Sequence, residues 1–138
     1  MTIQLNAYAS FDGDAREAME HYRDVLGGEL ELVTFGEYGQ AGTPAENLIM
    51  HGLLTTSQGL KLMGADAPPG TTHQVGTNLT VILSGDDEPV LRGYWEGLSA
   101  GATITVPLEP QMWGDVYGSC LDQYGLTWQV NIETSEGG

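Results

Sequence analysis

The feature that most constrains the fold is a pattern of predicted elements that occurs twice along the 138-residue chain. In the first copy, residues 3–11 alternate between apolar and polar side chains, which predicts a strand. Residues 14–26 then place apolar side chains at helical spacing, and Asp14 with Glu17 forms a capping-box signature. Three more strands are expected, at residues 29–36, 47–55 and 60–65. The first half is therefore predicted to be β-α-β-β-β.

The second copy begins after a segment rich in Pro, Gly and Thr. Residues 77–84 alternate as a strand, and a helix follows that is capped by Asp86 or Asp87, with Pro89 in its first turn. Three more strands are expected, at residues 102–108, 113–121 and 126–134. We predict one domain over residues 1–138, with module one at 1–66, a linker at 67–76 and module two at 77–138.

The two halves also match residue by residue. Four residues of the first half have the same residue type 72 positions later. They are Asn6, Asp14, Tyr22 and Leu26, which correspond in order to Asn78, Asp86, Tyr94 and Leu98. At an offset of 66, Gly59 and Leu60 fall on Gly125 and Leu126. Because a strand phase, a helix cap and a helical face recur together, duplication explains the pattern. The predicted fold class is α+β.

The charge balance excludes two classes of partner. The chain holds 19 Asp and Glu against four Lys and Arg, which gives a formal net charge of −15. Nucleic acid and anionic lipid are not expected as partners, because both are bound through basic side chains. Such acidity is typical of salt-adapted proteins and also occurs in ordinary bacterial proteins, and both origins stay open.

The sequence predicts a cytoplasmic protein. No apolar run approaches the roughly 20 residues of a membrane span, and the first 14 residues have no basic segment of a secretory signal. The single cysteine, Cys120, excludes an internal disulfide and is interpreted as a small buried hydrophobic residue.

Three stretches together resemble the PhnB-like branch of the vicinal-oxygen-chelate superfamily, which contains glyoxalases, bleomycin-resistance proteins and dioxygenases. They are NAYASFDGDAREAMEHYRDVLGGELEL, IMHGLLTTSQGLKLMGAD and MWGDVYGSCLDQYGLTWQVNI. The resemblance implies tandem β-α-β-β-β modules whose curved mixed sheets surround a cavity, and a homodimer. It implies no particular reaction, because the superfamily includes isomerases, dioxygenases, antibiotic-modifying enzymes and metal-free drug binders. The chain also lacks a glycine-rich nucleotide loop between a strand and a helix.

The resemblance also implies where a metal ion would bind. Metal-dependent members place His and Glu ligands on the first and last strands of each module. The predicted strand phases give four such positions: Asn6, Met63, Asn78 and Gln129. Neutral amides and one thioether are poor ligands for Zn²⁺ or Fe²⁺, which favour imidazole and carboxylate groups. We therefore expect no metal ion and no other cofactor.

Other side chains are candidates for contact with a small molecule. Tyr8 and Thr80 share strand faces with Asn6 and Asn78, and His51 interrupts an apolar strand where it could act as an acid, a base or a hydrogen-bond donor. Trp113 and Tyr117 suit either a pocket for a flat molecule or a surface.

Several prominent residues have a structural interpretation instead. Trp128 is expected in the core and Asp122 at the start of a type I turn. The glycine-rich stretch near Glu37, Tyr38 and Glu46 is interpreted as a loop or as a flap over the cavity.

The sequence therefore predicts a metal-free protein that binds a small molecule in a cavity. The alternative is a metal-dependent lyase, isomerase or dioxygenase of the same superfamily. A third possibility is a protein that acts by association alone, with its pocket closed by Met50, Met63 and the tryptophans.

Overall fold

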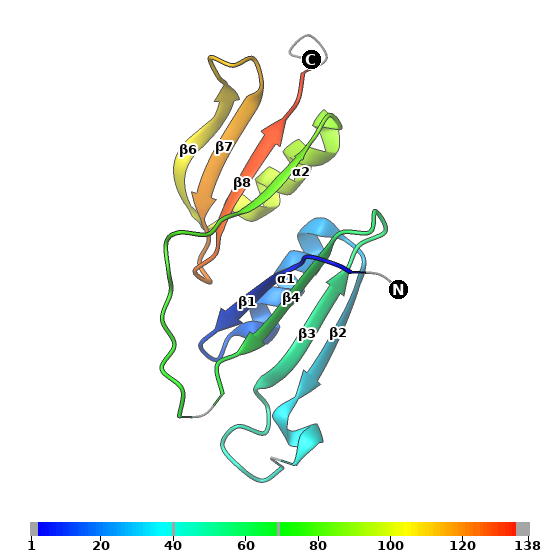
Figure 1. Ribbon diagram of the computed structural model, residues 1–138, viewed down its shortest axis with the longest axis vertical. Helices are drawn as coiled ribbons and strands as arrows, with labels where there is room; N and C mark the ends of the chain where they lie inside the picture. The colour runs from blue at the N-terminus through cyan, green and yellow to red at the C-terminus, as the bar shows by residue number, and fades with distance from the viewer. Residues whose placement is uncertain (1–2, 40, 69, 135–138) are drawn as a thin grey trace. The chain divides into compact units, whose positions relative to one another are not determined.

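The computed structural model describes residues 3–39, 41–68 and 70–134. They divide into two compact units, Met1–Gln74 and Val75–Gly138, and each unit is considered by itself (Figure 1). Among the described residues, no helix is both long enough and apolar enough to cross a membrane.

The first unit is a four-stranded mixed sheet with one helix on it. Its elements in chain order are β1 (Ala7–Phe11), α1 (Ala15–Leu26), β2 (Glu29–Thr34), the 3-10 helix η1 (Phe35–Tyr38), β3 (Ile49–Thr55) and β4 (Lys61–Asp66). The strand order is β1-β4-β3-β2, in which β1 and β4 are parallel and the other neighbours are antiparallel.

The second unit repeats this layout. Its elements are β5 (Val81–Gly85), α2 (Glu88–Ser99), β6 (Thr103–Pro110), β7 (Val116–Leu121) and β8 (Thr127–Ile132). The strand order is β5-β8-β7-β6, again with the first and last strands of the unit parallel. The predicted α+β class and the repeated β-α-β-β-β layout are confirmed.

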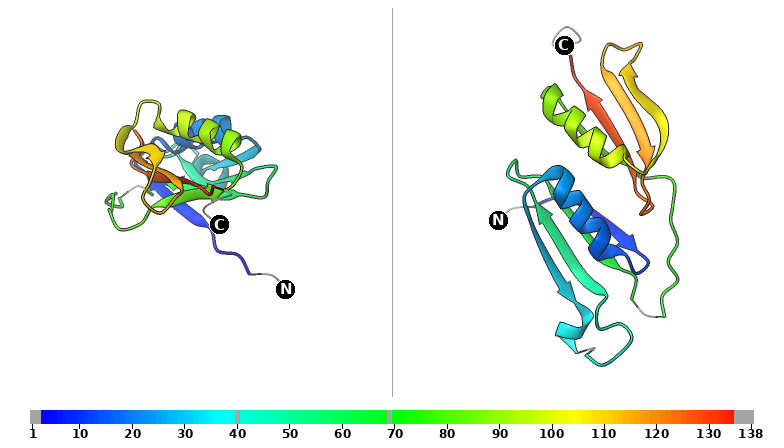
Figure 2. Two further views of the ribbon diagram at one scale, coloured as in Figure 1. Left: turned by 90° about the horizontal axis from the view of Figure 1, so that it is seen from above. Right: turned by 180° about the vertical axis from the view of Figure 1, so that it is seen from behind.

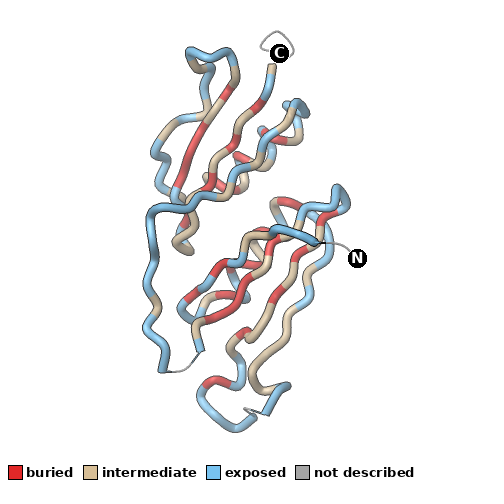
Figure 3. Tube along the Cα trace, viewed as in Figure 1, coloured by how far each residue is buried: buried red, intermediate tan, exposed pale blue. Residues whose placement is uncertain are grey.

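Each helix covers one face of its own sheet, as the view from behind shows (Figure 2). In the first unit, α1 buries Ala18, Met19 and Tyr22 against the sheet. Gly64 of β4 permits this close packing, because a Cβ there would lie 2.9 Å from Met19 Sδ. In the second unit, Trp95 of α2 packs on Gly118 of β7, where a Cβ would lie 3.0 Å from its ring. In each unit, buried residues lie along the helix and along the strands of the sheet (Figure 3).

The side of each sheet that points away from its helix is called the α1-distal or the α2-distal face. The α1-distal face carries the alternate residues Tyr8, Ser10, His51, Leu53, Lys61 and Met63. The α2-distal face carries Ile82, Ser84, Tyr117, Ser119, Gln129 and Asn131.

The predicted starts of the two first strands are wrong. Strand β1 begins at Ala7 rather than at residue 3, and Ile3 and Leu5 are each 99% exposed. The reason is the length of the partner strand, because Ala7 pairs with Leu62, the second residue of β4. Strand β5 likewise begins at Val81 rather than at residue 77.

The register of the internal repeat also differs from the predicted offset of 72. Val81, 74 positions after Ala7, pairs with Trp128, which lies 66 positions after Leu62. Therefore the first strands correspond at an offset of 74, whereas the final hairpins keep the predicted offset of 66. Tyr8 corresponds to Ile82 and not to Thr80.

The predicted capping box of the first helix is absent. Asp14 occupies the N-cap position but makes no side-chain cap hydrogen bond. The buried carboxylate of Asp66, at the end of β4, accepts hydrogen bonds from the backbone N–H of Gly13 and of Ala15 instead, each at 2.9 Å. In the second unit Asp87, one of the two predicted caps, accepts a hydrogen bond from Val90 N–H.

Candidate functional site

The α1-distal face brings together three of the predicted site residues, Tyr8, His51 and Met63. Tyr8 pairs with Met63 across the parallel β1–β4 ladder, and Met63 pairs in turn with Leu53 of β3. Tyr8 Oη lies 3.5 Å from His51 Nδ1, and the two ring centroids are 5.9 Å apart. A separation of 3.5 Å is at the long limit of a hydrogen bond. Since Tyr8 is 53% exposed, the pair is open to a ligand.

The pair combines a phenol with an imidazole, two groups that can exchange a proton. A neutral imidazole donates from one nitrogen and accepts at the other, so the tautomer of His51 decides which partner donates across the contact. The thioether of Met63 and the Leu53 side chain supply adaptable apolar surface beside it. The arrangement can hold a ring-shaped molecule and offer it one donor and one acceptor.

Asn6 lies outside this group. It precedes β1 by one residue, and its side-chain amide donates to Gln4 Oε1 at 3.4 Å. The same oxygen accepts a hydrogen bond of 3.2 Å from Lys61 Nζ. The residue that faces Met63 across the sheet is therefore Tyr8, not Asn6.

The α2-distal face carries Gln129 and Tyr117. Gln129 of β8 lies between Ile82 of β5 and Ser119 of β7. Tyr117 pairs with Asn131, whose side-chain amide donates to Asp115 Oδ2 at 3.0 Å. These side chains present neutral hydrogen-bonding groups on one sheet surface.

Trp113 extends this surface from the turn before β7. Its ring meets that of Tyr117 edge-on, with centroids 5.8 Å apart at an angle of 65°, and it is 59% exposed. Hydrogen bonds from Gln111 N–H to Asp115 O and from Gly114 N–H to Gln111 O fix the turn.

Asn78 and Thr80 do not take the strand positions that were expected for them. Both precede β5, which begins at Val81, and both are exposed. On the first strand of this unit the residue next to Gln129 is Ile82.

The corrected register allows the metal-site test to be repeated. The pairs of first-strand and last-strand residues on the distal faces are Tyr8 with Met63 and Ile82 with Gln129. This set offers a phenol, a thioether, an alkyl group and an amide. It suits a divalent transition-metal ion no better than the set predicted from the sequence, which has Asn6 and Asn78 in place of Tyr8 and Ile82. Across residues 3–39, 41–68 and 70–134, no three His, Cys, Asp or Glu side chains converge as a metal-binding group.

Two residues with a predicted structural role have that role. Trp128 is 1% exposed and donates its indole N–H to Asp122 Oδ2 at 2.9 Å. The other oxygen of Asp122 accepts from Tyr124 N–H and Leu126 N–H, which closes the β7–β8 turn. Cys120 is fully buried, and burial, reinforced by the charge of Asp122, raises the pKa of its thiol to about 11.

Hydrogen bonds hold the described residues of the glycine-rich stretch after β2. Thr34 and Glu37 form a reciprocal capping box around η1, and these hydrogen bonds hold the pKa of the Glu37 carboxyl below its usual value. Glu46 accepts a hydrogen bond from Gly42 N–H at 2.8 Å. The described part of this stretch is therefore a hydrogen-bonded loop.

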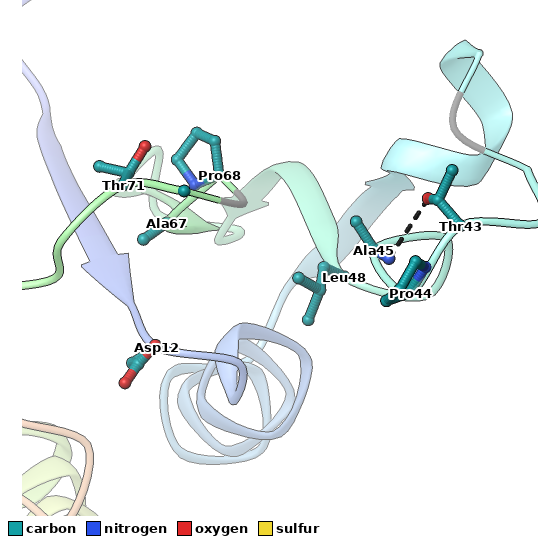
Figure 4. Close-up of a pocket in the computed structure, with 9 residues that line it drawn as sticks. Asp12, Thr43, Pro44, Ala45, Leu48, Ala67, Pro68 and Thr71 are labelled. Carbon is teal, nitrogen blue, oxygen red and sulfur yellow. Dashed lines mark hydrogen bonds between the residues drawn. The ribbon is translucent and has the colours of Figure 1, made fainter.

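An open depression of about 360 Å³ lies at one end of the first unit (Figure 4). It is lined by Asp12, Thr43, Pro44, Ala45, Leu48, Ala67, Pro68, Gly70 and Thr71. None of the predicted site residues is among them, and Asp12 is their one charged side chain. The depression is separate from the group around Tyr8.

Sequence reasoning did not include Leu53, Ser119 and Asn131 among the site residues. Alternation along β3, β7 and β8 was the signal that could have found them, because residues two apart on a strand share a face.

Comparison with known proteins places the chain in a family. The sequence model of the Glyoxalase/Bleomycin resistance protein/Dioxygenase superfamily matches residues 4–130. The chain belongs to this superfamily.

Individual known proteins resemble the chain along nearly its whole length. Protein YjdN of Escherichia coli is 27% identical, over 94% of this chain and 95% of its own. The crystal structure of protein PA1353 from Pseudomonas aeruginosa is 28% identical with a TM-score of 0.85, and the match covers 96% of this chain and 98% of that one.

A structure described as PhnB protein from Bacillus cereus has a TM-score of 0.72 at 21% identity, over 95% of this chain and 100% of that one. The predicted membership of the superfamily is therefore confirmed by the family model, and this last structure shows that the chain shares the fold of a PhnB protein.

Proposed function

We propose that the chain is a cytoplasmic, homodimeric protein that binds a small organic molecule without a metal ion, at the distal faces of its two sheets. One observation carries the proposal. On both faces the central pair of first-strand and last-strand residues, Tyr8 with Met63 and Ile82 with Gln129, offers ligand contacts but no metal-ligand group.

The side chains around these pairs are of the kinds that line small-molecule sites. Aromatic rings, a thioether and a few polar groups give contact area together with a small number of directed hydrogen bonds. Tyr8, His51 and Met63 form such a set in the first unit, and Trp113, Tyr117 and Gln129 form another in the second.

An acid–base enzyme is the second candidate, and the contact between Tyr8 and His51 is the observation that favours it. A lyase or isomerase requires a group that takes a proton and a group that returns it. An imidazole within 3.5 Å of a phenol supplies both on the α1-distal face. A metal-dependent version would need ligands that the described residues do not bring together.

The first experiment is metal analysis of untagged protein purified without chelator, followed by calorimetric titration with Zn²⁺, Mn²⁺, Ni²⁺ and Fe²⁺. We expect no stoichiometric metal and no heat of specific binding. A tightly bound ion that is lost in Gln129→Leu but retained in Gln123→Leu, an exposed control in the β7–β8 turn, would refute the metal-free proposal.

The second experiment locates the ligand. Amide spectra of the labelled full chain are recorded with aromatic probes, and we expect the shifted signals to cluster on the distal-face residues of at least one unit. Met63→Ala should weaken a ligand on the α1-distal face, whereas Met112→Ala is the matched control because Met112 is fully exposed. Ligands that bind only around Asp12 and Pro44 would contradict the proposed site.

A further inference from the structure

The two distal faces differ in their ionisable groups. The final hairpins correspond at an offset of 66, so Lys61, Met63 and His51 of the first unit correspond to Thr127, Gln129 and Tyr117 of the second. An ammonium, a thioether and an imidazole are therefore replaced by a hydroxyl, an amide and a phenol. The groups that can carry positive charge on the α1-distal face have no counterpart on the α2-distal face.

The neutral groups of the α2-distal face retain free hydrogen-bonding capacity. Gln129 is half-buried between Ile82 and Ser119, and its side chain makes no hydrogen bond to residues 70–134 or to the rest of the described chain. A primary amide offers two donors and one acceptor carbonyl, and those of Gln129 are accessible to solvent, since none of the buried side-chain N and O atoms of the described residues lacks a partner. Gln129 is thus positioned to pair with a ligand that has both donors and acceptors.

Asn131 adds a second amide whose orientation is fixed. Its amide nitrogen donates one hydrogen to Asp115 Oδ2 at 3.0 Å, and therefore its carbonyl oxygen and its second N–H are left for a ligand. The other oxygen of Asp115 lies 3.5 Å from Thr134 N–H. Both oxygens of Asp115 are therefore engaged within the unit, but the carboxylate keeps its negative charge and has further lone pairs.

The aromatic side chains supply a flat apolar surface next to these amides. Trp113 and Tyr117 meet edge-on, which leaves ring faces available for stacking with a planar molecule. Trp113 is exposed although it is one of only three tryptophans in the chain.

We propose that the α2-distal face selects an uncharged planar ring that carries an amide-like edge, with a donor and an acceptor side by side. The inference rests on the proposed small-molecule function and names the class of ligand for this face. On the face itself a charged ring would lose hydration without gaining an opposite charge, because Ile82, Ser84, Tyr117, Ser119, Gln129 and Asn131 are all neutral. The neighbouring Asp115 carboxylate is the group that would favour a cation, and the cationic probe below tests its influence.

The test uses three probes of nearly one shape: benzamide, which is neutral, benzoate, which is an anion, and benzamidinium, which is a cation. Each is titrated into the isotope-labelled full chain while the indole N–H signal of Trp113 and the side-chain amide signals of Gln129 and Asn131 are followed. We expect benzamide to shift these signals saturably, with a dissociation constant about ten-fold lower than that of either ion, since one net hydrogen bond corresponds to about that factor.

High salt separates local chemistry from the overall charge of −15. At about 1 M NaCl the screening length falls to about 3 Å, so long-range repulsion of benzoate and attraction of benzamidinium largely disappear. The preference for benzamide should persist under these conditions.

Three variants complete the experiment. Gln129→Leu should weaken benzamide about ten-fold, Gln129→Glu should transfer the preference to benzamidinium, and Gln123→Leu, on the exposed turn, should change nothing. Equal or tighter binding of an ion to the unmodified face would overturn the ligand class while leaving small-molecule binding intact. If no probe shifted signals on either distal face, the proposed function itself would be contradicted.

Discussion

Replacing Asp66 should destabilise the first unit more than any exposed acidic substitution. Asp66 is 3% exposed, and its carboxylate accepts three backbone N–H groups: Gly13 and Ala15 on Oδ1, and Ile49 on Oδ2, each at 2.9 Å. It therefore joins the end of β4 to the start of α1 and to the start of β3. Local sequence offers no substitute, because Asp14 does not cap the helix with its side chain.

The magnitude follows from the number of donors left without an acceptor. A hydrogen bond to a charged group contributes about 1.5–3 kcal/mol, and the bonds from Ala15 and Ile49 are buried. Since water can reach the partly buried Gly13 N–H, we expect Asp66→Ala to cost about 4–6 kcal/mol of unfolding free energy. Asp66→Asn keeps one acceptor oxygen but turns an N–H₂ group toward a donor, and should cost about 2–3 kcal/mol.

Urea unfolding followed by far-ultraviolet circular dichroism measures the effect, and native-state amide exchange at Ala15 and Ile49 measures it locally. Tryptophan fluorescence is unsuitable, because Trp95, Trp113 and Trp128 all lie in the second unit. Asp12→Ala is the matched control, since Asp12 is exposed at the same end of the unit. A loss for Asp66→Ala no larger than that of the control would refute the reasoning.

Three further outcomes are expected. Asp122→Ala should cost about 3 kcal/mol, because it removes the acceptor of the Trp128 indole and of two turn amides, and it should shift the Trp128 fluorescence maximum in urea titrations. The folded-state pKa of Cys120 is raised from 9.0 to about 11, so its contribution to stability is complete below pH 9 and is lost as the pH rises toward 11; in Cys120→Ala the unfolding midpoint should fall less over that window. Light scattering should give twice the 14.8 kDa mass of the chain, and a monomer at micromolar concentration would contradict the proposed dimer.

The repeated layout could be predicted because it depends on local patterns. Strand alternation, helical spacing and turn glycines are properties of neighbouring residues, and they located both helices and the strand phases that put Met63 and Gln129 on the distal faces. The prediction of the superfamily depended on longer ordered motifs in the same segments.

The errors arose where distant residues decide the outcome. The length of β1 is set by the start of β4, which pairs with it from across the chain, and therefore Asn6 falls outside the strand. The cap of α1 comes from Asp66, 51 residues after Ala15. The predicted offset of 72 relied on identical residues such as Asn6 and Asn78. The pairing of each first strand with the last strand of its unit gives an offset of 74 instead, which aligns Tyr8 with Ile82. The role of the site residues stays a prediction until ligands are tested.

The parallel pairing of the first and last strands of each unit determines when its sheet can be completed during synthesis. Strand β1 leaves the ribosome first in its unit, but its sheet partner β4 leaves last, since Ala7 pairs with Leu62. At a synthesis rate of about 5–20 residues per second, β1 waits roughly 3–11 s for its partner. Strand β5 waits almost as long for β8, since Val81 pairs with Trp128. During each interval the growing chain carries an unpaired, uncharged strand, and this is the stage at which a chaperone would have most to protect.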